Sequence, residues 1–138
     1  MIRAVIDANV FISAVISPKG NPAKILGAWK ADKFQLILSA AILQEIGRVL
    51  QYPKIARRHR WSREKIQTFV DDLAQLATMT PGKIHLRVIP EDPADDAYIE
   101  CAVEGEAEYL VSGDKHLLDL GAYGSVTILT PRAFLGIL

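Results

Sequence analysis

Five short apolar runs alternate along the chain with stretches that carry apolar residues at helical spacing. These runs predict β-strands at 2–6, 34–38, 84–89, 109–111 and 126–129. Short buried strands separated by helices are typical of an α/β domain. The pattern therefore predicts a mostly parallel sheet of about five strands with helices between them.

The stretches between these runs begin and end at residues that favour helix termini. Ser39 and Ser62 each precede an amphipathic stretch, and three dipeptides place a capping residue directly before a proline. These dipeptides are Asn21-Pro22, Asp92-Pro93 and Thr130-Pro131. The expected helices cover 10–16, 22–32, 40–51, 63–76 and 93–104, followed by a short helix through Leu118 and a terminal helix from Pro131.

The length of 138 residues, half of them hydrophobic, fits one domain spanning 1–138. The single cysteine cannot form an internal disulfide or a thiolate zinc site, which indicates a reducing compartment. The N-terminal apolar stretch is interrupted by Arg3 and Asp7, and no apolar run approaches the roughly 20 residues of a membrane span. We therefore expect a soluble cytoplasmic protein without a membrane segment.

Basic and acidic residues are segregated, although the totals of 16 Lys plus Arg and 16 Asp plus Glu balance. Residues 48–65 contain seven basic side chains and one acid, whereas residues 91–119 contain ten acids and one lysine. The basic stretch offers Arg57, Arg58 and Arg60 beside Trp61, a combination that binds single-stranded nucleic acid. The alternative is a solvated loop. We expect Trp61 to pack beside the cap of the next helix rather than to stack on a base.

Four carboxylates are expected at one edge of the sheet. Asp7 follows the first strand, Asp96 lies early in the helix after the third, and Asp114 follows the fourth. Glu45 lies about two turns into the helix after the second strand. Parallel sheets bind ligands beyond the carboxyl ends of their strands, so these four side chains should converge.

Such a cluster requires a proton or a cation, because two like charges about 4 Å apart cost about 4 kcal/mol at an effective dielectric near 20. Oxygen ligands alone favour Mg²⁺ or Mn²⁺, and such ions activate water for phosphodiester hydrolysis. Isolated acids at helix starts also act as caps or dipole partners. On that ground Asp92 is interpreted as an N-cap and Asp95 as a first-turn charge, and Asp114 could be a turn residue or a cap. The three histidines, His59, His85 and His116, are too scattered for a zinc site.

Four segments in order resemble the PIN-domain nucleases, in particular the toxins related to VapC. They are Asp7-Ala8-Asn9-Val10-Phe11-Ile12-Ser13, then Glu45, then Pro93-Ala94-Asp95-Asp96-Ala97-Tyr98-Ile99-Glu100-Cys101-Ala102, then Tyr109-Leu110-Val111-Ser112-Gly113-Asp114-Lys115-His116-Leu117-Leu118. The resemblance covers essentially the whole chain and implies a three-layer α/β/α sandwich.

The resemblance also implies roles for individual residues. Asp7, Glu45, Asp96 and Asp114 match the family's catalytic, metal-binding acids, while Asn9 and Ser112 match residues that orient them. His116 is a departure, because relatives often carry a second Asp there in a Gly-Asp-x-Asp-Leu pattern. His116 could instead contact the scissile phosphate, and Asp119 lies close enough in sequence to replace the missing carboxylate.

The function implied by the resemblance is an Mg²⁺- or Mn²⁺-dependent endoribonuclease, the toxin of a toxin–antitoxin pair, forming a homodimer and binding a small antitoxin. A haloacid-dehalogenase-type phosphatase needs a second Asp two residues after the first, where this chain has Asn9. A response-regulator receiver needs an acidic pair near Asp7, which is absent. A catalytically inactive PIN fold that binds RNA or protein remains an alternative, and metal-dependent cleavage separates it from the enzyme.

Overall fold

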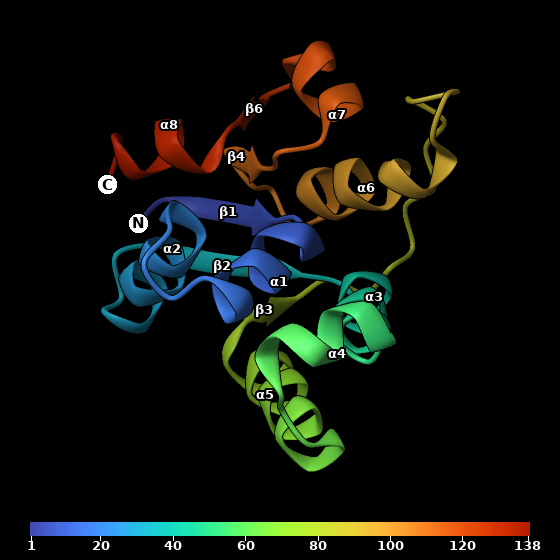
Figure 1. Ribbon diagram of the computed structural model, residues 1–138. Coiled ribbons are helices and arrows are strands. Elements are labelled where there is room, and N and C mark those ends of the chain that lie inside the picture. The colour runs from blue at the N-terminus through green and yellow to red at the C-terminus, as the bar shows by residue number, and fades with distance from the viewer.

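The computed structural model describes residues 1–138 and contains one six-stranded sheet with helices on both faces (Figure 1). The strand order is β3-β2-β1-β4-β6-β5, and every pairing is parallel except the antiparallel pair of β5 with β6. The strands are β1 (Arg3–Ile6), β2 (Gln35–Leu38), β3 (Thr78–Met79), β4 (Tyr109–Val111), β5 (Ala122–Tyr123) and β6 (Val126–Leu129). The α/β class and the mostly parallel sheet are confirmed.

Eight α-helices and one short 3₁₀ helix, η1, surround the sheet. They are α1 (Ala8–Ile16), α2 (Asn21–Lys30), α3 (Ala40–Leu50), α4 (Pro53–His59), α5 (Arg63–Leu76), η1 (Pro93–Asp95), α6 (Asp96–Glu104), α7 (Lys115–Leu120) and α8 (Pro131–Leu135). The hydroxyls of Ser39, Ser62 and Thr130 each accept a backbone N–H three residues on, which confirms the predicted N-caps. The cap of α2 is Gly20 rather than Asn21, one residue earlier than predicted. None of these helices is long and apolar enough to cross a membrane.

The central strands are buried on both faces, which explains why they are continuous apolar runs in the sequence. In β1, β2 and β4 all residues after the first are buried, and a cluster of 30 buried apolar residues forms the core. Helix α6 packs against β1, β2 and β4, while α7 and α8 pack against β6. This core fixes the positions of β1 and β4, from whose ends the candidate site is built.

The expected strand at 84–89 is wrong. The strand next to β2 is the two-residue β3, and residues 82–89, here called the strap, run along helix α6 instead. Backbone N–H groups of the strap donate to three carboxylates spaced four residues apart on α6. These bonds are Val88 and Ile89 to Asp96, Leu86 to Glu100, and Gly82 and Lys83 to Glu104. The strap is extended, as its alternating apolar pattern suggests, but its backbone N–H groups bind side chains of α6 rather than a neighbouring strand.

The basic stretch is not the solvated loop weighed as an alternative, because residues 53–59 form helix α4. Its end is fixed by His59, whose Nδ1 accepts the Trp61 N–H at 2.8 Å. The ring proton must therefore lie on Nε2, which donates to the Leu50 carbonyl at 2.8 Å. Trp61 packs edge-on against Phe69 with ring centroids 5.5 Å apart, so it lies beside the start of α5, as expected from the sequence.

Candidate metal centre

Asp7 ends β1 and caps α1 at the centre of the sheet. Its side chain is only 2% exposed. One carboxylate oxygen accepts the backbone N–H of Asn9 at 3.0 Å, and the other accepts the Ser112 hydroxyl at 2.6 Å. Burial raises the pKa of the Asp7 carboxyl, and these hydrogen bonds oppose the rise. Asp7 is therefore a buried acid held in one orientation by two donors.

Ser112 connects the two acids that follow the central strands. It lies just after β4, is fully buried, and accepts the Asp114 backbone N–H at 2.9 Å while it donates to Asp7. Asp114 in turn caps α7, because its Oδ1 accepts the Leu117 N–H at 3.1 Å. The ends of β1 and β4 are thus tied together through one hydroxyl, and Asp114 is both a cap and a site residue.

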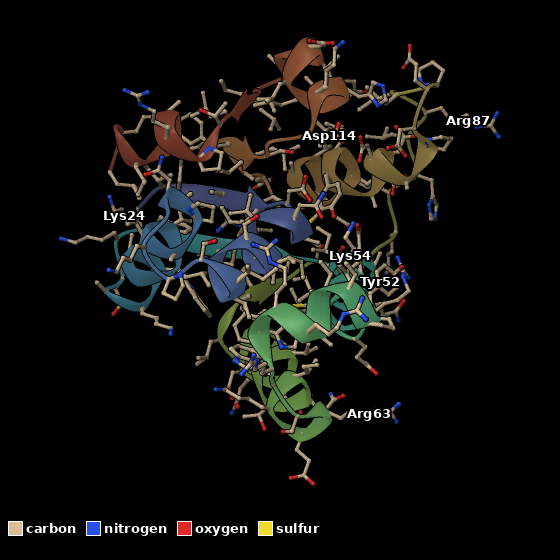
Figure 2. The ribbon with its side chains drawn as sticks, in the orientation of Figure 1. Lys24, Tyr52, Lys54, Arg63, Arg87 and Asp114 are labelled. Atoms are coloured by element: carbon tan, nitrogen blue, oxygen red, sulfur yellow. The ribbon has the colours of Figure 1, made fainter.

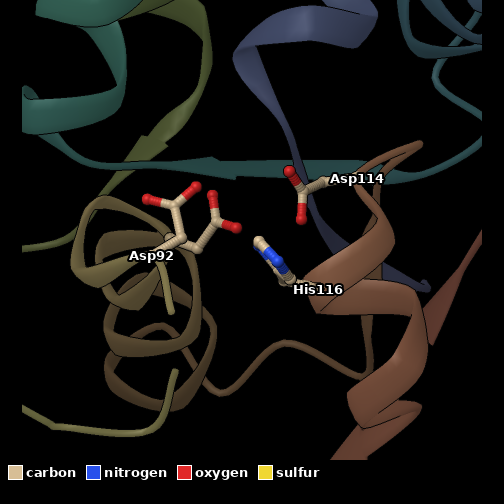
Figure 3. Close-up of side chains that lie close together, drawn as sticks. Asp92, Asp114 and His116 are labelled. Atoms are coloured by element: carbon tan, nitrogen blue, oxygen red, sulfur yellow. The ribbon is translucent and has the colours of Figure 1, made fainter. Parts of the chain in front are cut away.

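A group of four side chains lies beside these acids, contributed by two segments. One ligand atom from each of Asp92, Asp95, Asp114 and His116 lies within 4.8 Å of the others. Figure 3 shows Asp92 on one side facing Asp114 and His116, which come from the start of α7. This group is called the acidic cluster below. It combines three carboxylates and one imidazole, and an ion between them would lie at the carboxyl ends of the central strands.

Asp95 is the buried member of the acidic cluster. It is 7% exposed, and its Oδ2 has no hydrogen-bond partner. Burial first, and then the nearby Asp114, raise the pKa of Asp95 to about 8, with smaller contributions from Asp92 and Asp7. A buried carboxylate oxygen without a donor requires either a proton or a cation. The donor set and this unpartnered oxygen both fit a divalent metal ion.

The structure does not bring Asp96 into the acidic cluster. Its Oδ1 accepts the N–H groups of Val88 at 3.1 Å and Ile89 at 2.9 Å, so it fixes the strap. Consecutive helical residues point about 100° apart, so only one acid of the Asp95–Asp96 pair can face Asp114. Asp95 is therefore the acid of this pair that lies in the acidic cluster, whereas Asp96, the third metal-binding acid expected from the sequence, is bonded to the strap.

Glu45 reaches the site through Tyr98. The Tyr98 hydroxyl donates to Glu45 Oε2 at 2.7 Å and accepts the Ala8 N–H at 3.3 Å. Burial, together with the charges of Asp7 and Glu45, raises the pKa of Tyr98, so the phenol stays protonated and remains a donor. Glu45 is therefore linked to the residue that follows Asp7.

Two further residues have different surroundings from those expected. Asn9 is exposed, and its recorded bond to Asp7 comes from the backbone N–H rather than from its side chain. Asp119 does not belong to the acidic cluster. It lines a pocket of about 400 Å³ together with His116 and Glu91.

The sequence reasoning did not propose Asp92, Asp95 or His116 as metal ligands. A signal for the first two was available, because acids three residues apart lie on one face of a helical turn. His116 lies two residues after Asp114, which brings both side chains to the start of α7. The three histidines are scattered along the chain, and only the proximity of His116 to the acids in the folded structure shows the mixed donor set.

The predicted RNA-binding arginines lie on or next to α4. Arg57, Arg58 and Arg60 are all exposed, and none forms an ion pair. Helix α4 packs against α1, which begins after Asp7, and against α3, which carries Glu45. Figure 2 shows Lys54 on this helix, whereas Lys24 projects from α2 elsewhere on the molecule. The basic surface thus lies on a helix that packs against the helices next to Asp7 and Glu45.

Comparisons with known proteins agree with this architecture. A family model described as a PIN domain matches residues 3–116. An uncharacterised protein of Methanocaldococcus jannaschii is 34% identical over 119 residues, which cover 86% of this chain and 75% of that protein. The crystal structure of VapBC2 from Rickettsia felis, bound to a DNA fragment from its promoter, contains a chain with a similar fold. The TM-score is 0.59 at 11% identity, with 94% of this chain and 98% of that chain covered.

Proposed function

The chain belongs to the PIN domain family, and from that premise we propose that it is a metal-dependent endoribonuclease. The observation that carries the proposal is the unpartnered, buried Oδ2 of Asp95 in the acidic cluster. An oxygen in this position is favourable only if a proton or a cation compensates it. A divalent cation is the compensation that also provides chemistry on phosphodiesters.

The residues that would hold the ion are Asp92, Asp95, Asp114 and His116, with Asp7 adjoining through Ser112. A bound Mg²⁺ or Mn²⁺ would supply an activated water and stabilise the oxygens of a phosphodiester during hydrolysis. The chain supplies rigidity, because Ser112 holds Asp7 and the Asp114 backbone in fixed positions. This prior ordering of the carboxylates lowers the cost of binding the ion.

Helix α4 and the residue that follows it would hold the RNA. The exposed guanidinium groups of Arg57, Arg58 and Arg60 are free to contact phosphates, and α4 packs on the two helices that carry Asp7 and Glu45. Backbone phosphates near the acidic cluster need such a basic flank, because the carboxylates alone would repel them. We propose that α4 binds the RNA backbone on one side of the scissile bond.

The toxin role is the second part of the proposal. The structure from Rickettsia felis is described as VapBC2 bound to a promoter fragment, and its chain shares this fold. We propose by analogy that this chain is the toxin of a toxin–antitoxin pair, binds a cognate antitoxin protein and forms a homodimer. Co-expression with the protein encoded beside it, followed by size-exclusion chromatography, tests both interactions.

The test of the enzyme is cleavage of a pool of single-stranded and structured RNA by the purified protein. We expect cutting with Mg²⁺ or Mn²⁺, no cutting with a chelator, and at least a 100-fold loss in Asp114→Asn, as is typical when a group acting on the transition state is removed. Asp119→Asn is the matched control, because that acid lies outside the acidic cluster. RNA binding without cleavage under any ion would instead support the catalytically inactive binding module.

Removal of the α4 charges tests the RNA-binding surface. The triple variant Arg57→Gln, Arg58→Gln and Arg60→Gln should bind RNA more weakly. Its plot of log affinity against log salt should flatten by roughly 2, about 0.7 for each lost phosphate contact. The control removes three exposed lysines on or near α2, namely Lys19, Lys24 and Lys30. If the two triple variants have the same slope of log affinity against log salt, α4 does not bind the RNA backbone and is an ordinary solvated surface.

A further inference from the structure

His116 distinguishes this acidic cluster from a purely carboxylate site. Its imidazole lies within 4.8 Å of carboxylate oxygens from Asp92, Asp95 and Asp114 (Figure 3). The side chain is exposed and forms no hydrogen bond or ion pair, since the one ion pair of the protein joins His85 to Glu100. A ring nitrogen is therefore free to bind whatever the carboxylates bind.

A second observation shows that the acidic cluster is arranged for a ligand. Asp95, a member of the acidic cluster, is more than nine-tenths buried, and its Oδ2 has no hydrogen-bond partner. No two of the four ligand atoms are more than 4.8 Å apart, which is slightly more than twice a metal–oxygen distance of about 2.1 Å. One ion therefore fits among the four donors after small movements of the exposed side chains.

We propose that His116 is a nitrogen ligand of the metal ion, so that the site selects a divalent transition ion such as Mn²⁺ over Mg²⁺. This inference rests on the proposed nuclease function, because it concerns the same ion. Mg²⁺ is a hard ion that binds oxygen ligands and gives up its water reluctantly. Imidazole suits transition ions, which bind nitrogen more tightly than Mg²⁺ does.

The other three donors disfavour the softer ions Zn²⁺ and Cu⁺. They are all carboxylates, and the one cysteine, Cys101, is buried on α6 among core residues rather than in the acidic cluster. Sites for Zn²⁺ and Cu⁺ rely on several nitrogen or sulfur ligands. Three oxygens and one nitrogen therefore favour an ion at the early end of the transition series, for which Mn²⁺ is the probe.

The experiment uses electron paramagnetic resonance of Mn²⁺ added to the purified full-length protein. Pulsed measurements detect a directly bound ¹⁴N nucleus, and the signal of free Mn²⁺ reports displacement by Mg²⁺. We expect ¹⁴N coupling in the wild type and its loss in His116→Gln. In His116→Asp the preference for Mn²⁺ over Mg²⁺ should fall about tenfold or more, because the fourth donor becomes an oxygen.

His85→Gln is the matched control, since His85 is an exposed histidine outside the acidic cluster. It should keep both the coupling and the ion preference. Tight Mn²⁺ binding without ¹⁴N coupling, or an unchanged preference in His116→Asp, overturns the role of His116 but leaves the proposed metal-dependent nuclease intact. Failure of the wild type to bind Mn²⁺ or Mg²⁺ overturns both.

Discussion

Replacement of Asp95 by Asn should stabilise the protein when no metal is present, by an amount that grows as the pH rises from about 4 to about 8. The folded-state pKa of Asp95 is raised from 3.8 to about 8, by burial first and then by Asp114. Because this acid holds its proton more tightly in the folded state, the free energy of unfolding should fall as the pH rises from about 4 to about 8. Asp95→Asn removes the ionisable group and with it that loss of stability.

The size of the effect follows from the separation of the charges. Two carboxylates no more than 4.8 Å apart repel each other by about 3.5 kcal/mol or more at an effective dielectric near 20. The substituted amide still has to be buried, so we expect a net gain of about 2–3 kcal/mol at pH 8.5. At pH 4.5 Asp95 is already protonated in the folded wild type, and the two proteins should be about equally stable.

Urea-induced unfolding followed by circular dichroism measures the free energy of unfolding of both proteins at both pH values, first with a chelator and then with Mn²⁺. Saturating Mn²⁺ should stabilise the wild type at pH 8.5 by about 2.7 kcal/mol if its concentration is 100 times the Kd. Asp95→Asn should lose most of that gain. The matched control is Asp96→Asn, which weakens the charge-assisted bonds to the strap and should cost about 1 kcal/mol at pH 8.5 while keeping the response to Mn²⁺.

Two outcomes would refute this reasoning. In one, Asp95→Asn destabilises the metal-free protein by the same amount at pH 4.5 and pH 8.5, as a purely structural residue would. In the other, Asp96→Asn rather than Asp95→Asn abolishes the stabilisation by Mn²⁺. The second result would restore Asp96 as the metal ligand predicted from the sequence.

Two other substitutions test the packing around the site, and the same urea titrations measure both. Ser112→Ala removes the buried hydroxyl bonded to Asp7 and should cost about 1–3 kcal/mol; wild-type stability would contradict that role. Gly105→Ala would push a methyl group into the Ile37 side chain and should cost about 1–3 kcal/mol, whereas Gly27→Ala, with nothing within 4 Å, should stabilise by about 0.5–1 kcal/mol. Equal effects of the two glycine substitutions would contradict the close packing of α6 on β2.

The central sheet was predictable because its strands are buried on both faces. Runs such as 34–38 contain almost only apolar residues, and the serine caps before α3 and α5 mark where helices begin. The strand predicted at 84–89 was not distinguishable in this way. Its alternating pattern shows that one side of the chain is buried, and this is equally true of an extended segment that lies on a helix.

The sequence predicted where the candidate site lies in the fold, but it predicted only some of the residues that form it. The rule that ligands bind beyond the carboxyl ends of parallel strands located Asp7 and Asp114. The choice between Asp95 and Asp96 depends on the rotation of a single helical turn. That rotation is set by the bonds between Asp96 and the strap, which no periodicity in the sequence reveals.

The sheet ends on both sides in strands of only two residues, β3 and β5. Another chain can extend a sheet by forming backbone hydrogen bonds with an exposed edge strand. Very short edge strands offer too few free N–H and C=O groups for such pairing. Beyond β3 the strap is bonded to α6, so it does not lengthen that edge. A protein partner should therefore recognise this molecule through its surface side chains, and its specificity should depend on surface sequence rather than on backbone pairing with the sheet.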